Sequence, residues 1–497
     1  MKQIEKLLEK TKLPHWLIIF VLLMLLLRVP SFFEPYSYGD EMIYLTLGQG
    51  IRQGIPLYKG LHDNKPPLIY ILAGFAGSLF GFKVILALWS LVTICLFWKL
   101  AKTLFPSGGR LVQLSTIIFG LSTTLPLLEG NIVNSELFMI GLTILAFLII
   151  FTKKQDPKTL LFSGFVFGIG TLFKVPAAFD MPIIIFYWLI QSGLKKEELK
   201  EVILKSFYLI LGFILPIGIT FIWYGLAGAL KEYFAAAFMQ NVGYLSSFRP
   251  GDMQKPFLVR NFPLLFRGFV VLGGILIMFL RRNKLSKEFI FITLWLLFTL
   301  FAVTLSERPY PHYLIQSIAP ISLLFAMLFT LQSIEQVLVI LPLTLALAIP
   351  VFYKFWYYPT FSYYLRFLKF TTRQISKEEY FSQFDGNVNR NYKIAEFLTN
   401  STKENERVFV WGDSTPVYAL SRRLPPIKYV ADYHISDFSS KNAILTALSA
   451  SLPKFIVILP KSKSFPEIMP FLSKNYLIVN TVEGAEIWDR LVVKVKR

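Results

Sequence analysis

Acidic, imidazole and ammonium side chains gather in the polar segment that follows the first long apolar stretch of the chain. Asp40 and Glu41 are adjacent, and His62, Asp63 and Lys65 follow further along the same segment. A carboxylate can accept a proton from a reacting hydroxyl group, and an ammonium group can bind an anionic leaving group. A solvated loop whose charges simply avoid lipid is the structural alternative for this pattern.

More side chains of the same kinds lie at the ends of later apolar stretches. Glu136 begins one stretch, Lys174 ends another, and Arg308, Tyr310 and His312 come just before a third. Carboxylates and cations at one membrane depth suit sugar transfer from a lipid-linked phosphate, whose tail lies in the bilayer and whose head group lies at the surface. Because phosphate leaves without needing a proton, one basic carboxylate and a cation or metal ion would suffice.

The composition requires a chain with many membrane spans. Of its 497 residues, 54% are hydrophobic and 16% are charged, and the mean hydropathy is +0.54. A soluble globular chain has a lower apolar share and a charged share near 25%. The excess of 51 Lys and Arg over 31 Asp and Glu would suggest nucleic acid in a soluble protein, but here the basic residues flank apolar stretches, as membrane topology requires.

Apolar stretches long enough to cross about 30 Å of hydrocarbon occur up to about residue 353. The stretch Pro66–Gly81 is short and opens with two prolines, so we expect it to lie along the membrane surface. Without it, eleven spans are expected, at 16–30, 84–101, 111–128, 136–152, 159–173, 176–192, 200–224, 262–281, 286–305, 312–331 and 335–353.

The basic residues orient these spans. Lys2, Lys6, Lys10 and Lys12 precede the first span and place the N-terminus in the cytoplasm. If Pro66–Gly81 does not cross the membrane, four later basic clusters also lie on the cytoplasmic side. They are centred on Lys99, Lys153, Lys195 and Arg281. All four would lie outside if that stretch crossed, against the positive-inside rule. We therefore expect a multi-pass protein of the plasma or inner membrane with its C-terminus outside.

The expected domains follow from the end of the apolar spans. Residues 1–359 form the transmembrane domain, with outer loops at 31–83 and 225–261. Residues 360–384 are a linker, and residues 385–497 form a soluble extracytoplasmic α/β domain. The second outer loop contains Leu230–Leu245, whose aromatic residues predict a helix along the membrane interface.

The last segment alternates short β-rich runs with helical patterns, which predicts a small α/β domain with a partly parallel sheet. The expected strands are Arg407–Trp411, Lys428–Val430, Phe455–Leu459 and Tyr476–Asn480, and the expected helices are Asn391–Thr399, Lys441–Ser451 and Phe465–Ser473.

The order and sidedness of these motifs resemble the GT-C polytopic glycosyltransferases, over about residues 10–335. The resemblance rests on Asp40-Glu41, Lys65-Pro66-Pro67-Leu68, Asn134-Ser135-Glu136, Lys174 followed by Pro176, and Arg308-Pro309-Tyr310-Pro311-His312-Tyr313. The branch it suggests is that of the bacterial relatives of protein O-mannosyltransferases and lipid A aminoarabinose transferases. The α/β domain is similar in style to the C-terminal domains of bacterial members.

This resemblance implies roles for individual residues. Asp40 would be the catalytic carboxylate, and Glu136 and Glu41 would be further acidic residues of the site. The contacts to the donor phosphate would be Lys65, Lys174, Arg308, His312 and Tyr310.

The chain departs from the relatives at two places. The second outer turn carries Glu where relatives often have Asp, and His62-Asp63-Asn64 replaces the Glu often found before Lys-Pro. Whether the site binds a divalent metal as a cofactor therefore stays open, with His62 and Asp63 as candidate ligands. Two adjacent residues do not have the spacing that is typical of metal ligands.

Each assignment has a structural alternative. Asp40 could cap a helix that starts near Glu41, and Glu136 could be a helix N-terminal charge favoured by the dipole. Lys65 and Lys174 could anchor span ends by snorkelling, and His312 could only bond a backbone carbonyl.

The expected function is transfer of a sugar from a polyprenyl-phosphate donor to an extracytoplasmic protein, lipid or cell-envelope glycan, with inversion. The expected partners are that donor, the acceptor and the bilayer, with no nucleic acid. A transporter or flippase of a lipid-linked or amphipathic substrate is the main alternative, but its ionisable residues would lie near the bilayer midplane in paired halves. An inactive scaffold that carries the outer domain as a binding module stays open, and it would tolerate loss of Asp40.

Overall fold

The computed structural model describes residues 13–243, 255–413 and 415–491. The chain folds as two compact units, and each contains segments far apart in the sequence. The helical unit is Met1–Ser31, Lys83–Trp223 and Met239–Thr360, and the mixed unit is Phe32–Phe82, Tyr224–Phe238 and Phe361–Arg497. The N-terminal lysines that orient the first span, and residues 244–254 of the second outer loop, lie outside the described residues.

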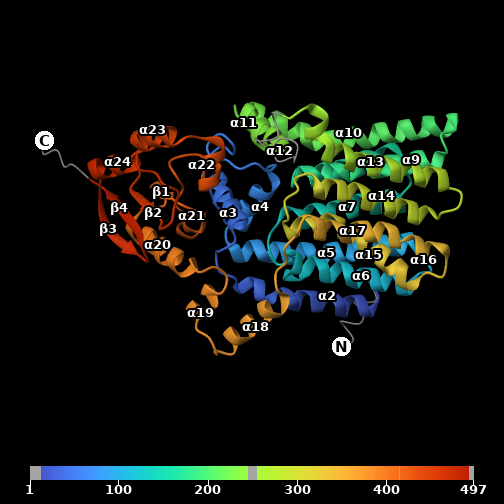
Figure 1. Ribbon diagram of the computed structural model, residues 1–497, viewed down its shortest axis with the longest axis horizontal. Coiled ribbons are helices and arrows are strands. Elements are labelled where there is room, and N and C mark those ends of the chain that lie inside the picture. Colours follow the sequence, from blue (N-terminus) through green and yellow to red (C-terminus); the bar gives the residue numbers. More distant parts are fainter. Residues whose placement is uncertain (1–12, 244–254, 414, 492–497) are drawn as a thin grey trace. The chain divides into compact units, whose positions relative to one another are not determined.

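The helical unit is a bundle of apolar helices in which α6 packs against α15, α7 against α8, and α14 against α15 (Figure 1). Its helices are α2 (His15–Arg28), α5 (Leu79–Leu104), α6 (Gly109–Thr124), α7 (Ser135–Thr152), α8 (Pro157–Thr171), α9 (Met181–Ser192), α10 (Lys196–Leu226), α12 (Gln240–Gly243), α13 (Phe257–Arg281), α14 (Lys287–Thr304), α15 (Ile315–Thr330), α16 (Ile334–Leu338) and α17 (Ile340–Phe352). Short 3₁₀ segments precede or follow several of them, at η1 (Val29–Phe33), η2 (Pro126–Leu128), η3 (Val175–Phe179) and η7 (Pro311–Leu314).

Nine helical stretches among the described residues are long and apolar enough to cross a membrane. The other two expected spans, 111–128 and 159–173, are also helical, as α6 with 16 residues and α8 with 15 residues. The prediction of a polytopic helical membrane protein is therefore confirmed.

The stretch Pro66–Gly81 forms a short helix and then a break. Helix α4 (Leu68–Ala76) has nine residues, and its C-cap Gly77 is left-handed with φ 71°. At about 1.5 Å per residue, a nine-residue helix is less than half the length that the hydrocarbon layer requires. The next helix, α5, begins at Leu79, so α4 alone cannot cross, as expected.

The mixed unit combines helices with one sheet. Its helices are α3 (Gly39–Arg52), α4, α11 (Leu230–Phe234), α18 (Thr360–Thr371), α19 (Lys377–Ser382), α20 (Val388–Ser401), α21 (Thr415–Ser421), α22 (Asp432–Phe438), α23 (Lys441–Ser451) and α24 (Ile468–Asn475). A π-helical turn, Ala235–Met239, continues α11 toward α12, so the expected helix Leu230–Leu245 is helical as far as Gly243, where the described residues end.

The sheet has four strands, β1 (Val408–Trp411), β2 (Phe455–Ile458), β3 (Tyr476–Val482) and β4 (Ala485–Arg490). Their order is β1-β2-β4-β3, with β1 parallel to β2 and the other two pairings antiparallel (Figure 1). The prediction of a partly parallel α/β sheet is confirmed. Its core includes Phe409, Trp411, Ile456, Leu472 and Trp488.

Two details of the expected sheet are wrong. Lys428–Val430 is not a strand, because Tyr429 makes only an isolated parallel bridge, and its partner is His62 of the first outer loop. Strand β4, which lies between β2 and β3, was not expected, because half of its six residues, Ala485–Arg490, are charged and they show no regular alternation with apolar residues; the strand follows a Glu483-Gly484 turn of positive φ. The expected boundaries of the linker and of the C-terminal domain, at 359 and 384, stay predictions.

Helices α3 and α4 approach each other at two glycines. A Cβ added to Gly48 would lie 2.4 Å from the backbone nitrogen of Gly74, and a Cβ added to Gly74 would lie 3.0 Å from the Gly48 carbonyl oxygen. Since backbone atoms cannot move aside as a flexible side chain can, this contact requires glycine on α3. Helix α3 also packs against α21 and buries every residue from Glu41 to Gly50.

We therefore predict that Gly48→Ala destabilises the protein by about 1–3 kcal/mol, because the new methyl group forces α3 and α4 apart. The measurement is the midpoint of thermal unfolding in detergent. Gly39→Ala is the matched control on the same helix, where an added Cβ finds no atom within 4 Å. Equal midpoints for the two variants would contradict the close contact.

Candidate functional site

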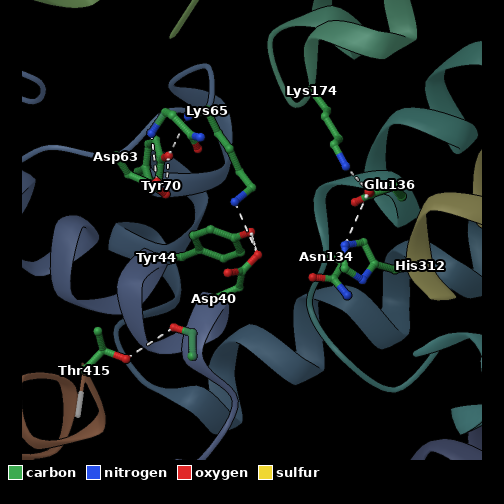
Figure 2. A network of polar contacts seen from close by, with 12 residues as sticks. Asp40, Tyr44, Asp63, Lys65, Tyr70, Asn134, Glu136, Lys174, His312 and Thr415 are labelled. Atoms are coloured by element: carbon green, nitrogen blue, oxygen red, sulfur yellow. Dashed lines mark hydrogen bonds and ion pairs between the residues drawn. The ribbon is translucent and has the colours of Figure 1, made fainter. Parts of the chain in front are cut away.

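Asp40 lies in the first turn of α3, where a negative charge is favoured by the helix dipole. One of its oxygens, Oδ2, accepts a hydrogen bond from the Tyr44 hydroxyl (2.9 Å) and lies 3.3 Å from the Lys65 ammonium (Figure 2). The helix is not capped by this carboxylate, because the N-cap is Tyr38 and has no side-chain cap hydrogen bond. The alternative that Asp40 is an N-cap is therefore wrong.

The two adjacent acidic residues of α3 face different surroundings. Asp40 has 31% of its side chain exposed, whereas Glu41 is 1% exposed. Adjacent residues on a helix point about 100° apart, and here that rotation separates an accessible carboxylate from a buried one. Of this pair, Asp40 is the carboxylate that solvent can reach.

The loop that carries Lys65 is organised by the buried carboxylate of Asp63. Its Oδ2 accepts a hydrogen bond from the Tyr70 hydroxyl (2.7 Å), and its Oδ1 accepts one from the Asn64 backbone N–H (2.8 Å). The same Oδ1 lies 3.3 Å from His434 Nε2 on α22. Figure 2 shows Asp63 and Tyr70 beside the Lys65 loop.

These partners keep Asp63 ionised. Burial by itself raises its pKa, but the Lys65 charge and the hydrogen bonds from His434 and Tyr70 outweigh burial and hold the pKa of Asp63 well below its usual range. A lowered pKa in the folded state stabilises the fold at any pH above the ordinary carboxyl value of about 4, and that stabilisation is lost as the pH falls further.

The candidate metal ligands His62 and Asp63 belong to this hydrogen-bonded network. The His62 ring packs against Tyr429 and Phe438, with ring centroids 5.3 and 5.2 Å apart. No group of three or more His, Cys, Asp or Glu side chains that could hold a metal ion occurs in the described ranges. Since both oxygens of Asp63 accept hydrogen bonds from protein donors, these residues do not fit a metal site, and we assign none to them.

A second polar cluster lies in the helical unit, at the start of α7. The Lys174 ammonium pairs with the Glu136 carboxylate and lies 3.8 Å from the centre of the Tyr313 ring. His312 Nε2 is 3.7 Å from the same Glu136 oxygen, and the Tyr310 ring stacks on the imidazole at 5.7 Å. Figure 2 shows Lys174, Glu136 and His312 pointing toward one another.

The other nitrogen of His312 binds a residue that was not predicted as part of the site, Glu129. This carboxylate is fully buried, pairs with His312 Nδ1, and accepts a hydrogen bond from Asn134 Nδ2 (3.0 Å). Burial raises the pKa of Tyr358 to about 12, with the Glu129 charge and a hydrogen bond to Glu129 adding to the effect. His312 therefore hydrogen-bonds one carboxylate, Glu129, and lies near a second, Glu136, so the alternative that it only contacts a backbone carbonyl is wrong.

Two buried cations were also missed, and both hold the turn that carries Glu129. Arg28 donates hydrogen bonds to the carbonyls of Gly130 (2.9 Å) and Thr123 (2.8 Å). Lys83 donates to the carbonyl of Asn131 (2.9 Å). The signal for them was present, because a lone cation inside an apolar stretch is costly and needs a partner.

The structure thus groups most of the predicted site residues into two sets. Asp40 and Lys65 are together in the mixed unit, and Glu136, Lys174 and His312 are together in the helical unit. Tyr310 joins the second set through His312. Arg308 is exposed, and its backbone N–H donates to Ser306 Oγ (3.3 Å).

This architecture is the GT-C glycosyltransferase fold, and the expected resemblance is confirmed by comparison with known proteins. Residues 64–224 match the family of dolichyl-phosphate-mannose-protein mannosyltransferases. Residues 388–488 match the C-terminal domain family of the competence-induced protein Ccs4. None of the curated proteins matches the chain in sequence.

Among solved structures, the chain is similar to ArnT from Cupriavidus metallidurans. The crystal structure of ArnT bound to undecaprenyl phosphate has a TM-score of 0.57 at 13% identity, over 96% of this chain and 98% of that chain. The apo structure of ArnT has a TM-score of 0.55 over the same shares. The archaeal oligosaccharyltransferase AglB from Archaeoglobus fulgidus has a TM-score of 0.46 at 11% identity, over 89% of this chain and 69% of that chain. At these identities the likeness to ArnT shows the fold.

The buried pair in the helical unit gives a prediction about stability. Lys174→Met leaves Glu136 buried without its ammonium partner and should destabilise the protein by about 3–5 kcal/mol. Adding Glu136→Gln to that variant should recover part of the loss, because it removes the unpaired charge. The measurement is again thermal unfolding in detergent.

Lys200→Met is the control for this prediction, since the Lys200–Glu197 pair is exposed on both sides and such pairs contribute little. A Lys174→Met variant as stable as Lys200→Met, or a double variant less stable than Lys174→Met alone, would show that the buried pair is not coupled.

Proposed function

We propose that this protein is an integral-membrane glycosyltransferase that moves a sugar from a polyprenyl-phosphate donor to an extracytoplasmic acceptor. The proposal is supported by the GT-C fold and by the likeness to ArnT, whose structure holds undecaprenyl phosphate. The observation that carries it is the accessible Asp40 carboxylate with the Lys65 ammonium 3.3 Å away. The acceptor class, whether protein, lipid or glycan, is left open.

In the proposed reaction Asp40 acts as a general base. A hydroxyl oxygen of the acceptor attacks the anomeric carbon of the sugar, and Asp40 takes the hydroxyl proton. The bond between that carbon and the phosphate oxygen breaks, and polyprenyl phosphate leaves with the electron pair. One displacement at the anomeric carbon inverts its configuration, and the phosphate needs no general acid.

Lys65 is proposed to bind the phosphate of the donor. Its ammonium has three N–H donors, so it can contact a phosphate oxygen while it stays near Asp40. An unneutralised phosphate is unfavourable both in the bound donor and in the transition state, so a fixed ammonium stabilises both. The loop hydrogen bonds around Asp63 and Tyr70 support this role, because they hold the backbone of Lys65 in one position.

Lys174, Arg308, His312 and Tyr310 are also proposed as contacts to the donor phosphate. In the helical unit the carboxylates of Glu129 and Glu136 already pair with His312 and Lys174. That set offers no excess of positive charge, so we propose polar contacts there and assign the main electrostatic contribution to Lys65.

We further propose that the protein lies in the plasma or inner membrane, with the reaction and the α/β domain on the extracytoplasmic side. The support is the charge distribution of the sequence. An odd number of spans with the basic clusters inside places both the first outer loop and residues 385–497 outside.

Asp40→Asn tests the base. The amide keeps the size of the side chain and can still accept the Tyr44 hydrogen bond, but it cannot take a proton. We expect release of polyprenyl phosphate from a panel of polyprenyl-phosphate sugars to fall by about 10²–10⁴-fold, with insertion and donor binding retained. Lys65→Ala should instead mainly weaken donor binding.

Asp437→Asn is the control for this assay, because it replaces another exposed carboxylate of the mixed unit. Wild-type rates in folded Asp40→Asn protein would remove Asp40 from the mechanism and favour Glu136 or the scaffold alternative. Absence of any release by the wild-type protein would refute the transferase itself.

Cysteine labelling tests the topology. In a Cys95→Ser background, a cysteine added after Arg497 should react with a membrane-impermeant maleimide in intact cells. Lys154→Cys, in an expected inside cluster, should react only after the membrane is opened. Protection of the C-terminal cysteine in intact cells would overturn the eleven-span topology.

A further inference from the structure

The C-terminal part of the chain reaches the loop that carries Lys65. His434 on α22 places Nε2 3.3 Å from Asp63 Oδ1, and the His62 backbone N–H donates to the Lys428 carbonyl at 2.8 Å. The imidazole and the carboxylate are both nearly inaccessible, at 2% of each side chain. A buried, charge-assisted contact of this kind fixes both partners strongly.

Hydrogen bonds connect this contact to the backbone of Lys65. The Tyr70 hydroxyl donates to Asp63 Oδ2 (2.7 Å) and accepts from the Lys65 backbone N–H (3.1 Å). On the other side, the Tyr58 hydroxyl donates to the Lys65 carbonyl (2.8 Å). The backbone N–H and C=O of Lys65 are therefore both held by buried tyrosines, and one of those tyrosines is held by Asp63.

The opposite end of Lys65 contacts the proposed base. Its ammonium lies 3.3 Å from Asp40 Oδ2 and 5.0 Å from the centre of the Tyr44 ring. A displacement of the Lys65 backbone would move that ammonium with it. The order of contacts thus runs from His434 through Asp63 and Tyr70 to Lys65, and it ends at Asp40.

We propose that His434 is a positioning residue for the reaction, which it serves by fixing Asp63 and through it the Lys65 ammonium. This inference rests on the proposed function. His434 does not touch the substrate, because it is buried. Its Nδ1 has no hydrogen-bond partner within the described part of the chain, so the ring serves the network through Nε2 alone.

The proposal gives the C-terminal part a specific role, which is to position Lys65. In this proposal it supplies the hydrogen-bond donor that sets the position of the Lys65 ammonium, in a loop far away in the sequence. Removal of residues 385–497 would therefore be a poor test of catalysis, since it would also expose the face of α3 that packs on α21. Single substitutions separate the two effects.

The test compares three variants of the full-length protein in the release assay. His434→Ala removes the donor and should lower kcat/KM about 10–100-fold, as a misplaced catalytic group does, mainly through a higher KM for the polyprenyl-phosphate sugar. His434→Gln keeps an N–H donor of similar reach and should restore most of the loss. Tyr70→Phe removes the next hydrogen bond but keeps the ring, and it should change KM in the same direction.

Tyr476→Phe is the matched control. It removes a buried hydrogen bond of the same unit, from the tyrosine hydroxyl to the Pro453 carbonyl at 2.9 Å, away from the Lys65 loop. It should lower stability without changing KM, which separates general destabilisation from positioning.

A double-variant comparison gives the decisive readout. In a Lys65→Ala background, His434→Ala should add less than about twofold, because the group that it positions is gone. Full additivity of the two losses, or wild-type kinetics in both folded His434→Ala and Tyr70→Phe, would overturn the positioning role while leaving the transferase intact. If the wild-type protein releases no polyprenyl phosphate, the proposed function fails first, and the positioning role fails with it.

Discussion

Buried charges in this protein must be paired, and this constraint fixes where its polar groups can be. Burial of an isolated ionised group costs several kcal/mol, so each buried cation needs a carboxylate or several carbonyls close by. Lys174 has Glu136, and Arg28 has two backbone carbonyls. The same rule holds around Asp63, whose partners come from three different elements. The chain around these groups is therefore held in place by electrostatics as well as by apolar packing.

Much of the fold could be predicted from the sequence, because apolar length and period are local properties. All eleven expected spans are helical in the structure, and the stretch Pro66–Gly81, expected as a helix along the membrane surface, contains the short helix Leu68–Ala76. The strands of the sheet were harder to predict from the sequence. Lys428–Val430 has β-forming residues, but its one bridge partner is His62, and strand partners far apart in the chain cannot be inferred from propensity. Strand β4 was missed because half of its residues are charged and they do not alternate regularly with apolar ones.

The candidate site, too, could be predicted from the sequence only in part. Asp40 and Tyr44 are one helical turn apart, so their hydrogen bond follows from the spacing of the sequence. The pairing of His312 with Glu129 joins residues 183 positions apart, and the contact of His434 with Asp63 joins two distant segments of the sequence that share no motif. Residue types indicated which groups could react. They could not indicate which buried partners those groups contact, because that depends on how distant segments pack.

The turn at Glu129–Asn131 also bears on how such a protein can change over time. Arg28 and Lys83 flank residues 32–82, and they bind carbonyls of adjacent residues, Gly130 and Asn131. The residues that flank segment 32–82 on both sides are thus bound to the same turn of the helical unit. Because the entropy cost of closing a loop grows only slowly with its length, a longer surface loop within this segment would cost little free energy as long as both cations hold its ends. The length of this segment can therefore change without a change in the helical scaffold that holds its two ends.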